Sequence, residues 1–395
     1  MRRTLAITLG FLLLFAAEIL RVYFIMPFPG SQQSNSIQIA FFLNKYMIWF
    51  RILGLLLVLP PAFYYFRRSG LWKKALLSTL ILFYGLVFYM FNFRFLADKM
   101  FYQPRNKSLV PVSANKVDTN QLVIGAVIND QARAYPIQII GYHHQVQDTA
   151  GGVPIMVTYC TVCRTGRIFS PIIDNKFQHF RLVGMDHFNA MFEDEATRSW
   201  WRQENGEAVA GALRGTKLEE LPSAQMRLGA WIREHSGTLI LQPDTIYKKQ
   251  YAGLQGYDSG TIEGSLEKRD SSSWKSKSWV VGISYNGHAK AYDWNDLVQK
   301  GIINDSFAGA PVLLVLENDS TSFHTWDRTV HGQVLHFEPD RSLKLFRDSN
   351  TNSLWSWSGV STDGPLKGAQ LKPIQSYQEF WHSWQSFHPS TVQYR

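Results

Sequence analysis

The sequence is poor in charge, in cysteine and in the motifs of nucleotide chemistry. Only 18% of its 395 residues are charged, although 46% are hydrophobic. It contains no phosphate loop, no dinucleotide fingerprint and no G-x-S-x-G nucleophile elbow. The formal net charge is +9, but no run of Lys and Arg of the nucleic-acid-binding type is present. These absences argue against a nucleotide-dependent enzyme, a serine hydrolase and a nucleic-acid-binding protein.

The two cysteines, Cys160 and Cys163, form the motif CTVC directly after the apolar run VPIMVTY. A structural zinc site normally has four ligands, so zinc here would need histidines or carboxylates from elsewhere. Arg164 stands where a C-x-x-C-H haem attachment site has histidine, which disfavours covalent haem. A redox dithiol, a pair of metal ligands and a plain disulfide all remain open. Nearby soft ligands that favour copper are His143, His144, Met156, Met185 and His187.

The apolar residues gather at the N-terminal end. Residues 5–26, 46–66 and 75–93 are each about long enough to cross a bilayer as a helix, which takes ~20 residues. The first could instead be a signal peptide, but its apolar stretch continues well past the ~7–15 residues of such a segment. We therefore predict three transmembrane helices, with the lipid bilayer as one partner. Glu18 and Arg21, three apart on one helix face, are expected to pair.

The distribution of Lys and Arg predicts the orientation of these helices. Arg2 and Arg3 precede the first helix, and the loop RRSGLWKK joins the second to the third. The loop of residues 27–38 carries no charge. Because cytoplasmic loops carry the basic excess, we expect a multi-pass inner-membrane protein with a cytoplasmic N-terminus and a periplasmic or otherwise extracytoplasmic C-terminal region.

One pattern occurs twice after the membrane segment. LVIGAVINDQARAYP begins at residue 122 and WVVGISYNGHAKAYD at residue 279. At a constant offset of 157, eight residues are identical: Gly125, Asn129, Ala132, Ala134, Tyr135, Asp148, Gly152 and Pro154 match Gly282, Asn286, Ala289, Ala291, Tyr292, Asp305, Gly309 and Pro311. With small loop deletions the match continues to Trp201 and Trp355, and to His235 and His388. The sequence therefore predicts two tandem homologous copies.

The predicted organisation follows from this repeat. It comprises a membrane anchor (1–97), a linker (98–121), a first copy (122–244), a linker or arm (245–278) and a second, degenerate copy (279–395). Short alternating runs separated by Asn-Asp or Asn-Gly have hairpin character, and residues 223–235 suggest a helix. The fold class is three N-terminal transmembrane helices followed by an α+β, strand-dominated region. At the positions of Cys160, Cys163 and His143 the second copy has Glu317, Ser320 and Lys300, so only the first copy can carry thiol chemistry.

The first copy resembles a bacterial family of unknown function, the domain of unknown function numbered 3179. The motifs that carry this resemblance lie between residues 121 and 244 and comprise AYP (134–136), His143 with Asp148, GGVP (151–154), TYCxxC (158–163), Asn189 with Asp194, Trp201 and GEAVAG (206–211). Family members usually read YCPLCGTA where this chain reads YCTVCRTG. The resemblance implies a site at His143, Cys160 and Cys163 and no established reaction.

Two hypotheses of different classes follow. In the first, an extracytoplasmic protein uses Cys160 and Cys163 as candidate catalytic residues, with His143 nearby, to bind a soft transition metal such as copper or to exchange thiol and disulfide. In the second, the two copies form a non-catalytic binding or assembly module whose cysteines are a structural disulfide. The cofactor stays unidentified, with a transition metal such as copper as the candidate of the first hypothesis, and a protein partner in the same membrane is compatible with both. A transporter has little support, because three short spans with few polar groups make a poor pathway.

Overall fold

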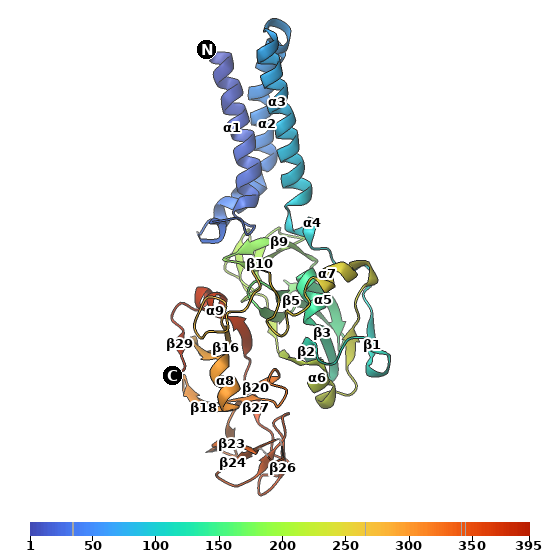
Figure 1. The fold of residues 1–395 in the computed structure, drawn as a ribbon, viewed down its shortest axis with the longest axis vertical. Coiled ribbons are helices and arrows are strands. Elements are labelled where there is room, and N and C mark those ends of the chain that lie inside the picture. Colours follow the sequence, from blue (N-terminus) through green and yellow to red (C-terminus); the bar gives the residue numbers. More distant parts are fainter. Residues whose placement is uncertain (34, 265, 341, 344) are drawn as a thin grey trace. The chain divides into compact units, whose positions relative to one another are not determined.

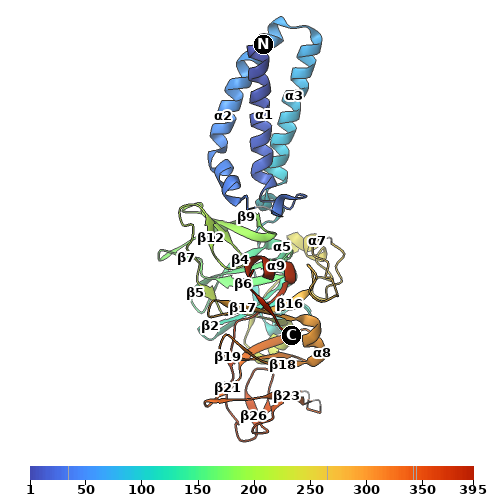
Figure 2. The same cartoon turned by 90° about the vertical axis from the view of Figure 1, so that its left-hand side faces the viewer.

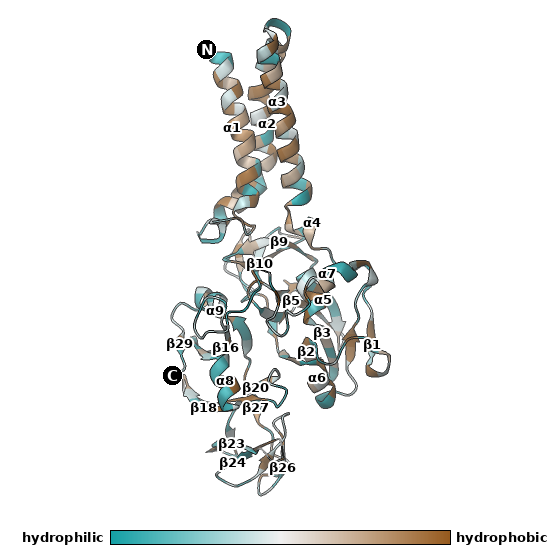
Figure 3. Ribbon diagram, in the orientation of Figure 1, coloured by the Kyte–Doolittle hydropathy of each residue, from teal (hydrophilic) through white to brown (hydrophobic). Residues whose placement is uncertain are grey.

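Three long apolar helices form the N-terminal part of the chain, α1 (Arg2–Tyr23), α2 (Ile37–Arg68) and α3 (Leu71–Tyr89), which continues into the π-helix η2 (Met90–Arg94). They run side by side in Figures 1 and 2 and are largely hydrophobic in Figure 3. Within the described residues these three helices are long and apolar enough to cross a membrane. The three predicted helices are confirmed, although α2 begins nine residues before the expected start because residues 37–45 are also mostly apolar.

The computed structural model describes residues 1–33, 35–264, 266–340, 342–343 and 345–395. The chain divides into two units. The first joins Met1–Tyr102 to Gln178–Lys217, and the second joins Gln103–Phe177 to Leu218–Arg395. Residues 178–217 thus interrupt the second unit in sequence while belonging to the unit of the apolar helices.

Close packing and one polar cluster hold the helices together. A methyl group added at Gly54 of α2 would lie 2.5 Å from the side chain of Leu14 on α1, so small residues let these helices approach, as is common between membrane helices. Glu18 is fully buried and accepts hydrogen bonds from Arg51 at 2.7 and 3.0 Å. Arg21 lies 3.6 Å from the same carboxylate. The expected pairing of Glu18 with Arg21 is confirmed, and the hydrogen bonds from Arg51 link α1 to α2.

A four-stranded antiparallel sheet completes the first unit. Its order is β12-β11-β10-β9, with β9 (Phe180–Asp186), β10 (Asn189–Asp194), β11 (Trp200–Arg202) and β12 (Ala208–Ala210). The amide of Met185 donates to the carbonyl of Ile25 at 2.7 Å, just after α1, and Phe41 of α2 packs edge-on against Trp200. The short elements η1 (Ser31–Gln33) and α4 (Ala97–Met100) also belong to this unit. The sheet is therefore packed against the ends of α1 and α2.

The second unit begins with two sheets. The first has the order β1-β15-β3-β2-β14, and the second the order β13-β6-β5-β4. Their strands are β1 (Leu109–Pro111), β2 (Leu122–Ile128), β3 (Gln131–Pro136), β4 (Gln145–Ala150), β5 (Val153–Cys160), β6 (Thr165–Phe169), β13 (Glu220–Leu221), β14 (Ala224–Arg227) and β15 (Leu239–Leu241). Smaller elements are η3 (Val112–Ala114), α5 (Ile137–His143), β7 (Ile172–Ile173), β8 (Lys176–Phe177) and α6 (Leu228–Glu234). The predicted helix at residues 223–235 is thus a strand followed by a two-turn helix.

The rest of the second unit has a similar order of elements. Its sheets are β28-β16-β17-β29, β18-β19-β20-β27 and β23-β24-β25-β26. Their strands are β16 (Trp279–Tyr285), β17 (His288–Asp293), β18 (Ile302–Phe307), β19 (Ala310–Leu316), β20 (Phe323–Asp327), β23 (Phe337–Asp340), β24 (Leu345–Asp348), β25 (Leu354–Trp355), β26 (Ser361–Asp363), β27 (Lys372–Pro373), β28 (Tyr377–Phe380) and β29 (Val392–Gln393). The helices are α8 (Trp294–Lys300) and α9 (Trp381–Phe387), and β21 (Thr329–Val330) and β22 (Gln333–Val334) form a small hairpin.

The hairpins that open these two regions form where the turn residues predict them. Asn129 and Asp130 join β2 to β3, and Asn286 and Gly287 join β16 to β17, all four with positive φ. Two consecutive residues at positive φ match the right-handed twist of a two-residue hairpin. A strand-rich α+β region is therefore confirmed, whereas its interpretation as two homologous copies stays a prediction.

Residues 245–278, expected to be a linker or arm, contain ordered elements. They begin with η4 (Thr245–Tyr247) and α7 (Lys248–Ala252). Tyr257 is 1% exposed, and its hydroxyl donates to the carbonyl of Thr161 at 2.8 Å. The segment therefore packs over the turn that carries the cysteines, which its polar composition did not indicate.

Two glycines let a strand contact a tryptophan directly. A methyl group at Gly125 on β2 would lie 2.5 Å from the ring of Trp231, and one at Gly282 on β16 would lie 2.3 Å from the ring of Trp384. We expect Gly125→Ala and Gly282→Ala each to lower the free energy of unfolding by about 1–3 kcal/mol, because either methyl group overpacks the core. Thermal unfolding of the full chain in detergent measures this. Gly237→Ala, where a methyl group meets nothing within 4 Å, is the control, and an equal effect there would contradict the packing argument.

Candidate functional site

The cysteine motif forms a tight turn between two buried strands. Cys160 is the last residue of β5 and pairs with Thr165, the first residue of β6. Every residue from Ile155 to Cys160 is buried, as its run of apolar side chains predicts. Arg164 closes the turn with φ of +57°, a value uncommon outside glycine. The turn therefore places both cysteines in the interior.

Both thiols are buried. Cys160 and Cys163 are 0% exposed and are not joined by a disulfide. Burial, followed by hydrogen bonding with the Cys160 side chain, raises the pKa of the Cys163 thiol well above its ordinary value. Cys163 is therefore a protonated thiol at neutral pH, and it becomes a nucleophile only when its surroundings change.

The C-terminal strand and helix cover this turn. The amide of Phe380 donates to the carbonyl of Cys163 at 2.9 Å. The ammonium of Lys277 donates to the carbonyl of Val162 at 2.8 Å, and the imidazole of His382 lies 3.1 Å from the same oxygen. Burial and the charge of Lys277 lower the pKa of His382 to about 4, so this imidazole is neutral at pH 7. Two donors, the amide of Phe380 and the ammonium of Lys277, thus bind the carbonyl groups of the turn.

A buried ion pair stands beside the thiols. Arg167 on β6 donates to the carboxylate of Glu379 on β28 at 2.6 Å, and their side chains are 2% and 0% exposed. The second oxygen of Glu379 accepts from Ser383 at 3.1 Å, and Ser383 also hydrogen-bonds Cys163. The guanidinium of Arg167 stacks on the ring of Tyr377 at 3.2 Å from its centroid. The Cys163 thiol therefore belongs to a polar network inside the core.

Arg164 connects the turn to the segment that follows α7. It is 1% exposed and donates to the side chain of Gln378 at 2.9 Å and to the carbonyls of Tyr257 and Asp258 at 3.2 Å each. Its guanidinium also lies 3.7 Å from the ring centroid of Trp279. The sequence indicated only that Arg164 replaces a glycine of the resembled motif, whereas its side chain joins four separate segments.

His143 is the third residue of the predicted site. It ends α5, is fully buried, and its Nε2 lies 2.7 Å from the hydroxyl of Tyr251 on α7. In the described part of the chain, the one group of three His, Cys, Asp or Glu residues with ligand atoms within 4.8 Å of one another lies elsewhere. The neighbouring His144 contacts the carbonyl of Tyr159 at 3.1 Å, and burial lowers its pKa to about 4.

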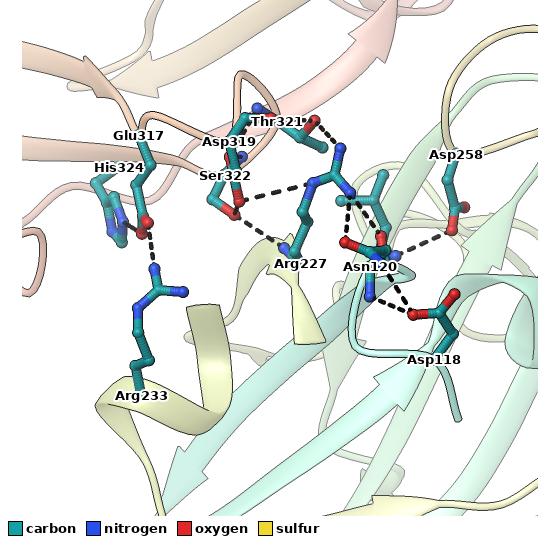
Figure 4. Close-up of polar contacts among 11 residues, drawn as sticks. Asp118, Asn120, Arg227, Arg233, Asp258, Glu317, Asp319, Thr321, Ser322 and His324 are labelled. Carbon is teal, nitrogen blue, oxygen red and sulfur yellow. Dashed lines mark hydrogen bonds and ion pairs between the residues drawn. The ribbon is translucent and has the colours of Figure 1, made fainter. Parts of the chain in front are cut away.

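The group that sequence reasoning missed comprises Glu234, Glu317 and His324. His324 Nε2 lies 2.9 Å from Glu317 and 3.7 Å from Glu234, and Arg233 pairs with Glu317 (Figure 4). Burial, and then the charge of Glu317, raise the pKa of Glu234. Arg233 and His324 both contact the carboxylate of Glu317, so a network of ion pairs and hydrogen bonds explains the group. One signal was present, since Glu317 occupies the position of Cys160 in the aligned repeat.

Comparison with known proteins gives one family. The model of a family described as Protein of unknown function (DUF3179) matches residues 103–391. The match covers the strand-rich region and leaves the three apolar helices outside it. Neither a curated protein nor a solved structure matches the chain. The family indicated by the cysteine motif and its flanking residues is confirmed.

We expect the ion pair of Arg167 and Glu379 to be essential to stability. Arg167→Met leaves a buried carboxylate without its partner, which should lower the free energy of unfolding by about 3–5 kcal/mol. Thermal and urea unfolding of the full chain in detergent measures this. Lys300→Met is the control, because Lys300 and Asp296 form an exposed pair at 3.7 Å and such pairs contribute about 0–1 kcal/mol. Equal losses of unfolding free energy in Arg167→Met and Lys300→Met would contradict a larger contribution from the buried pair.

Proposed function

We propose, from the premise that this chain belongs to the DUF3179 family of proteins of unknown function, that it is a membrane-anchored protein with a reversible dithiol at Cys160 and Cys163. The three apolar helices are the anchor, and the dithiol lies in the region that the family model matches. The observation that carries the proposal is the placement of both thiols, fully buried and not joined by a disulfide, in one tight turn between β5 and β6. It brings two sulfur atoms of one turn close together, so a disulfide between them needs no group from another part of the chain.

The reaction is an exchange with a disulfide-bearing oxidant. One cysteine, as its thiolate, attacks a sulfur of the external disulfide and releases one thiol, and the second cysteine then displaces the other. Two cysteine thiols are oxidised to one disulfide and the external disulfide is reduced to two thiols, so protons and electrons balance. The high pKa of Cys163 makes this exchange slow while the turn is covered. These properties suit a switch better than a rapid exchange catalyst.

Binding of a soft metal such as copper has less support. It needs His143 to converge with Cys160 and Cys163, whereas His143 is paired with Tyr251. Two thiols alone offer a soft metal only two ligands. Elemental analysis tests this alternative by comparing the purified full chain with the variant that has serine at both cysteine positions. Stoichiometric copper in the unchanged chain and none in the variant would favour metal binding.

A non-catalytic binding or assembly module is the second candidate. Its support is the complete burial of both thiols beneath residues 377–383. In this alternative the cysteines only fix the turn, and the surfaces of the strand-rich region bind a partner, for example a protein in the same membrane. The redox behaviour of the cysteines separates the two candidates.

We also propose that the strand-rich region consists of two tandem copies, of which only the first carries thiols. Three pairs of hydrogen bonds support this, because each joins the same residue types at aligned positions. They are Tyr135 to Asp148 (2.7 Å) and Tyr292 to Asp305 (2.8 Å), Trp201 to Asp194 and Trp355 to Asp348 (both 2.9 Å), and Trp231 to Thr238 (2.9 Å) and Trp384 to Thr391 (2.8 Å). The close contacts of Gly125 with Trp231 and of Gly282 with Trp384 recur in the same way.

The strand-rich region is proposed to lie outside the cytoplasm. Arg2, Arg3 and the basic loop after α2 support a cytoplasmic N-terminus. In bacterial cells, alkaline phosphatase fused after residue 97 should then be exported and active. Green fluorescent protein fused at the same position should be exported by the same route and should not fluoresce. The same phosphatase joined after residue 70 is the control and should be inactive. The reverse pattern would place the cysteines in the reducing cytoplasm.

We expect the full chain in detergent to lose both thiols reversibly on titration with oxidised and reduced dithiothreitol. The disulfide closes a short loop, which should stabilise the protein by roughly 2 kcal/mol. Thiol counting and thermal unfolding measure both effects, and no other cysteine contributes to the count. Cys160→Ser and Cys163→Ser should each abolish the redox dependence, whereas Thr161→Ser in the same turn should retain it.

Two outcomes would reject the switch. If both thiols persist in excess oxidant, the cysteines are inert. If the disulfide forms once and resists strong reductant in the folded protein, it is a structural staple, and the binding or assembly module becomes the better description.

A further inference from the structure

A polar cleft of 940 Å³ lies in the second unit, and neither cysteine is among its lining residues. Its walls come from the loop before β2, from α7 and the turn after it, from α8, and from the loop that follows β19. Figure 4 shows Arg227 lying between the loop of Asn120 and the loop of Asp319 and Thr321. A cavity of this size accommodates a small-molecule ligand.

Four buried polar atoms of residues that line this cleft have no hydrogen-bond partner in the described part of the chain. They are Nε of Arg227, Oδ1 of Asp258, Nε of Arg269 and Nε1 of Trp279. Arg227 Nε lies 3.7 Å from the carboxylate of Asp319, beyond hydrogen-bond distance. Each such group costs about 1–3 kcal/mol while it is unsatisfied. Their concentration at one cleft points to a ligand that supplies the missing hydrogen bonds.

The ring of Trp279 is covered by protein side chains. Trp279 is 5% exposed, and the guanidiniums of Arg164 and Arg269 lie 3.7 and 4.0 Å from its ring centroid. Trp294 packs edge-on against it at 6.0 Å. The ring is thus occupied by the protein, whereas the buried indole N–H has no hydrogen-bond partner in the described part of the chain.

The charges around the cleft favour a neutral ligand. Asp118, Asp258 and Asp319 would repel an anion, and Arg227 and Arg269 would repel a cation. The unpartnered atoms are three donors and one acceptor. A hydroxyl group donates one hydrogen bond and accepts two, so several hydroxyls on one molecule can satisfy both kinds.

The other lining residues of the cleft also suit a neutral ligand with several hydroxyl groups. Amide and hydroxyl side chains surround the charged groups, among them Gln121, Gln138, Asn295 and Thr321. Burial raises the pKa of the Asp258 carboxyl to about 6, so below that pH this group can also donate a hydrogen bond. We propose that the cleft is a binding site for a neutral carbohydrate, a site independent of the dithiol.

The test is calorimetric titration of the full chain in detergent with trisaccharides of one size and different charge. Maltotriose and triacetylchitotriose are the neutral probes, trigalacturonic acid is the anionic probe and chitotriose the cationic one. We expect a neutral trisaccharide to bind more tightly than either charged one. Trp279→Phe, which removes the indole N–H and keeps a ring, should weaken binding about tenfold, because the loss of one hydrogen bond is about 1.4 kcal/mol.

Arg269→Gln is a second variant and should also weaken binding. Because Arg269 is partly exposed, this variant keeps the test usable if Trp279→Phe does not fold. Trp326→Phe changes another buried tryptophan outside this cleft and should bind normally. The proposal is overturned if no neutral trisaccharide binds, if a charged probe binds more tightly, or if both cleft variants bind as well as the unchanged protein.

Discussion

The buried ion pair between Arg167 and Glu379 is the constraint on which the cysteine site depends. The two residues are 212 positions apart in the chain, and neither has appreciable contact with water. Removing two charges from water costs several kcal/mol for each ion, which only close pairing and further hydrogen bonds can offset. The ion pair therefore fixes β28 beside β6. The same placement puts the amide of Phe380 on the carbonyl of Cys163 and Ser383 beside its thiol.

Local features of the fold could be predicted from the sequence, and long-range ones could not. The three helices followed from runs of apolar residues, and the two opening hairpins from Asn-Asp and Asn-Gly, because one local interaction decides each of these elements. The position of CTVC at the end of a buried strand could likewise be predicted from the apolar run that precedes it. In contrast, nothing near Cys163 in the sequence indicates that residues 377–383 cover it. Polar composition likewise suggested a free arm at residues 245–278, whereas Tyr251 and Tyr257 anchor that segment in the core.

The two halves of the strand-rich region place different chemistry at aligned positions. Cys160 ends β5, and Glu317 follows β19 at the corresponding place. The cysteine lies in a turn closed by a buried arginine, whereas Glu317 pairs with Arg233 and His324. His143 was placed with the cysteines by sequence resemblance, yet its ring contacts tyrosines of α5, η4 and α7. A resemblance between short motifs identifies which residues belong to a site, but it does not give the distances between them.

The order of the chain also sets when the thiols become covered. Cys160 and Cys163 leave the ribosome long before β28 and α9, which are the last large elements to be made. At a synthesis rate of ~5–20 residues per second, the interval between Arg167 and Glu379 lasts roughly 10–40 s. Throughout this time the turn lacks its cover, and both sulfur atoms can meet reagents in their compartment. Reagents therefore reach the turn more easily during synthesis than after β28 and α9 have closed over it.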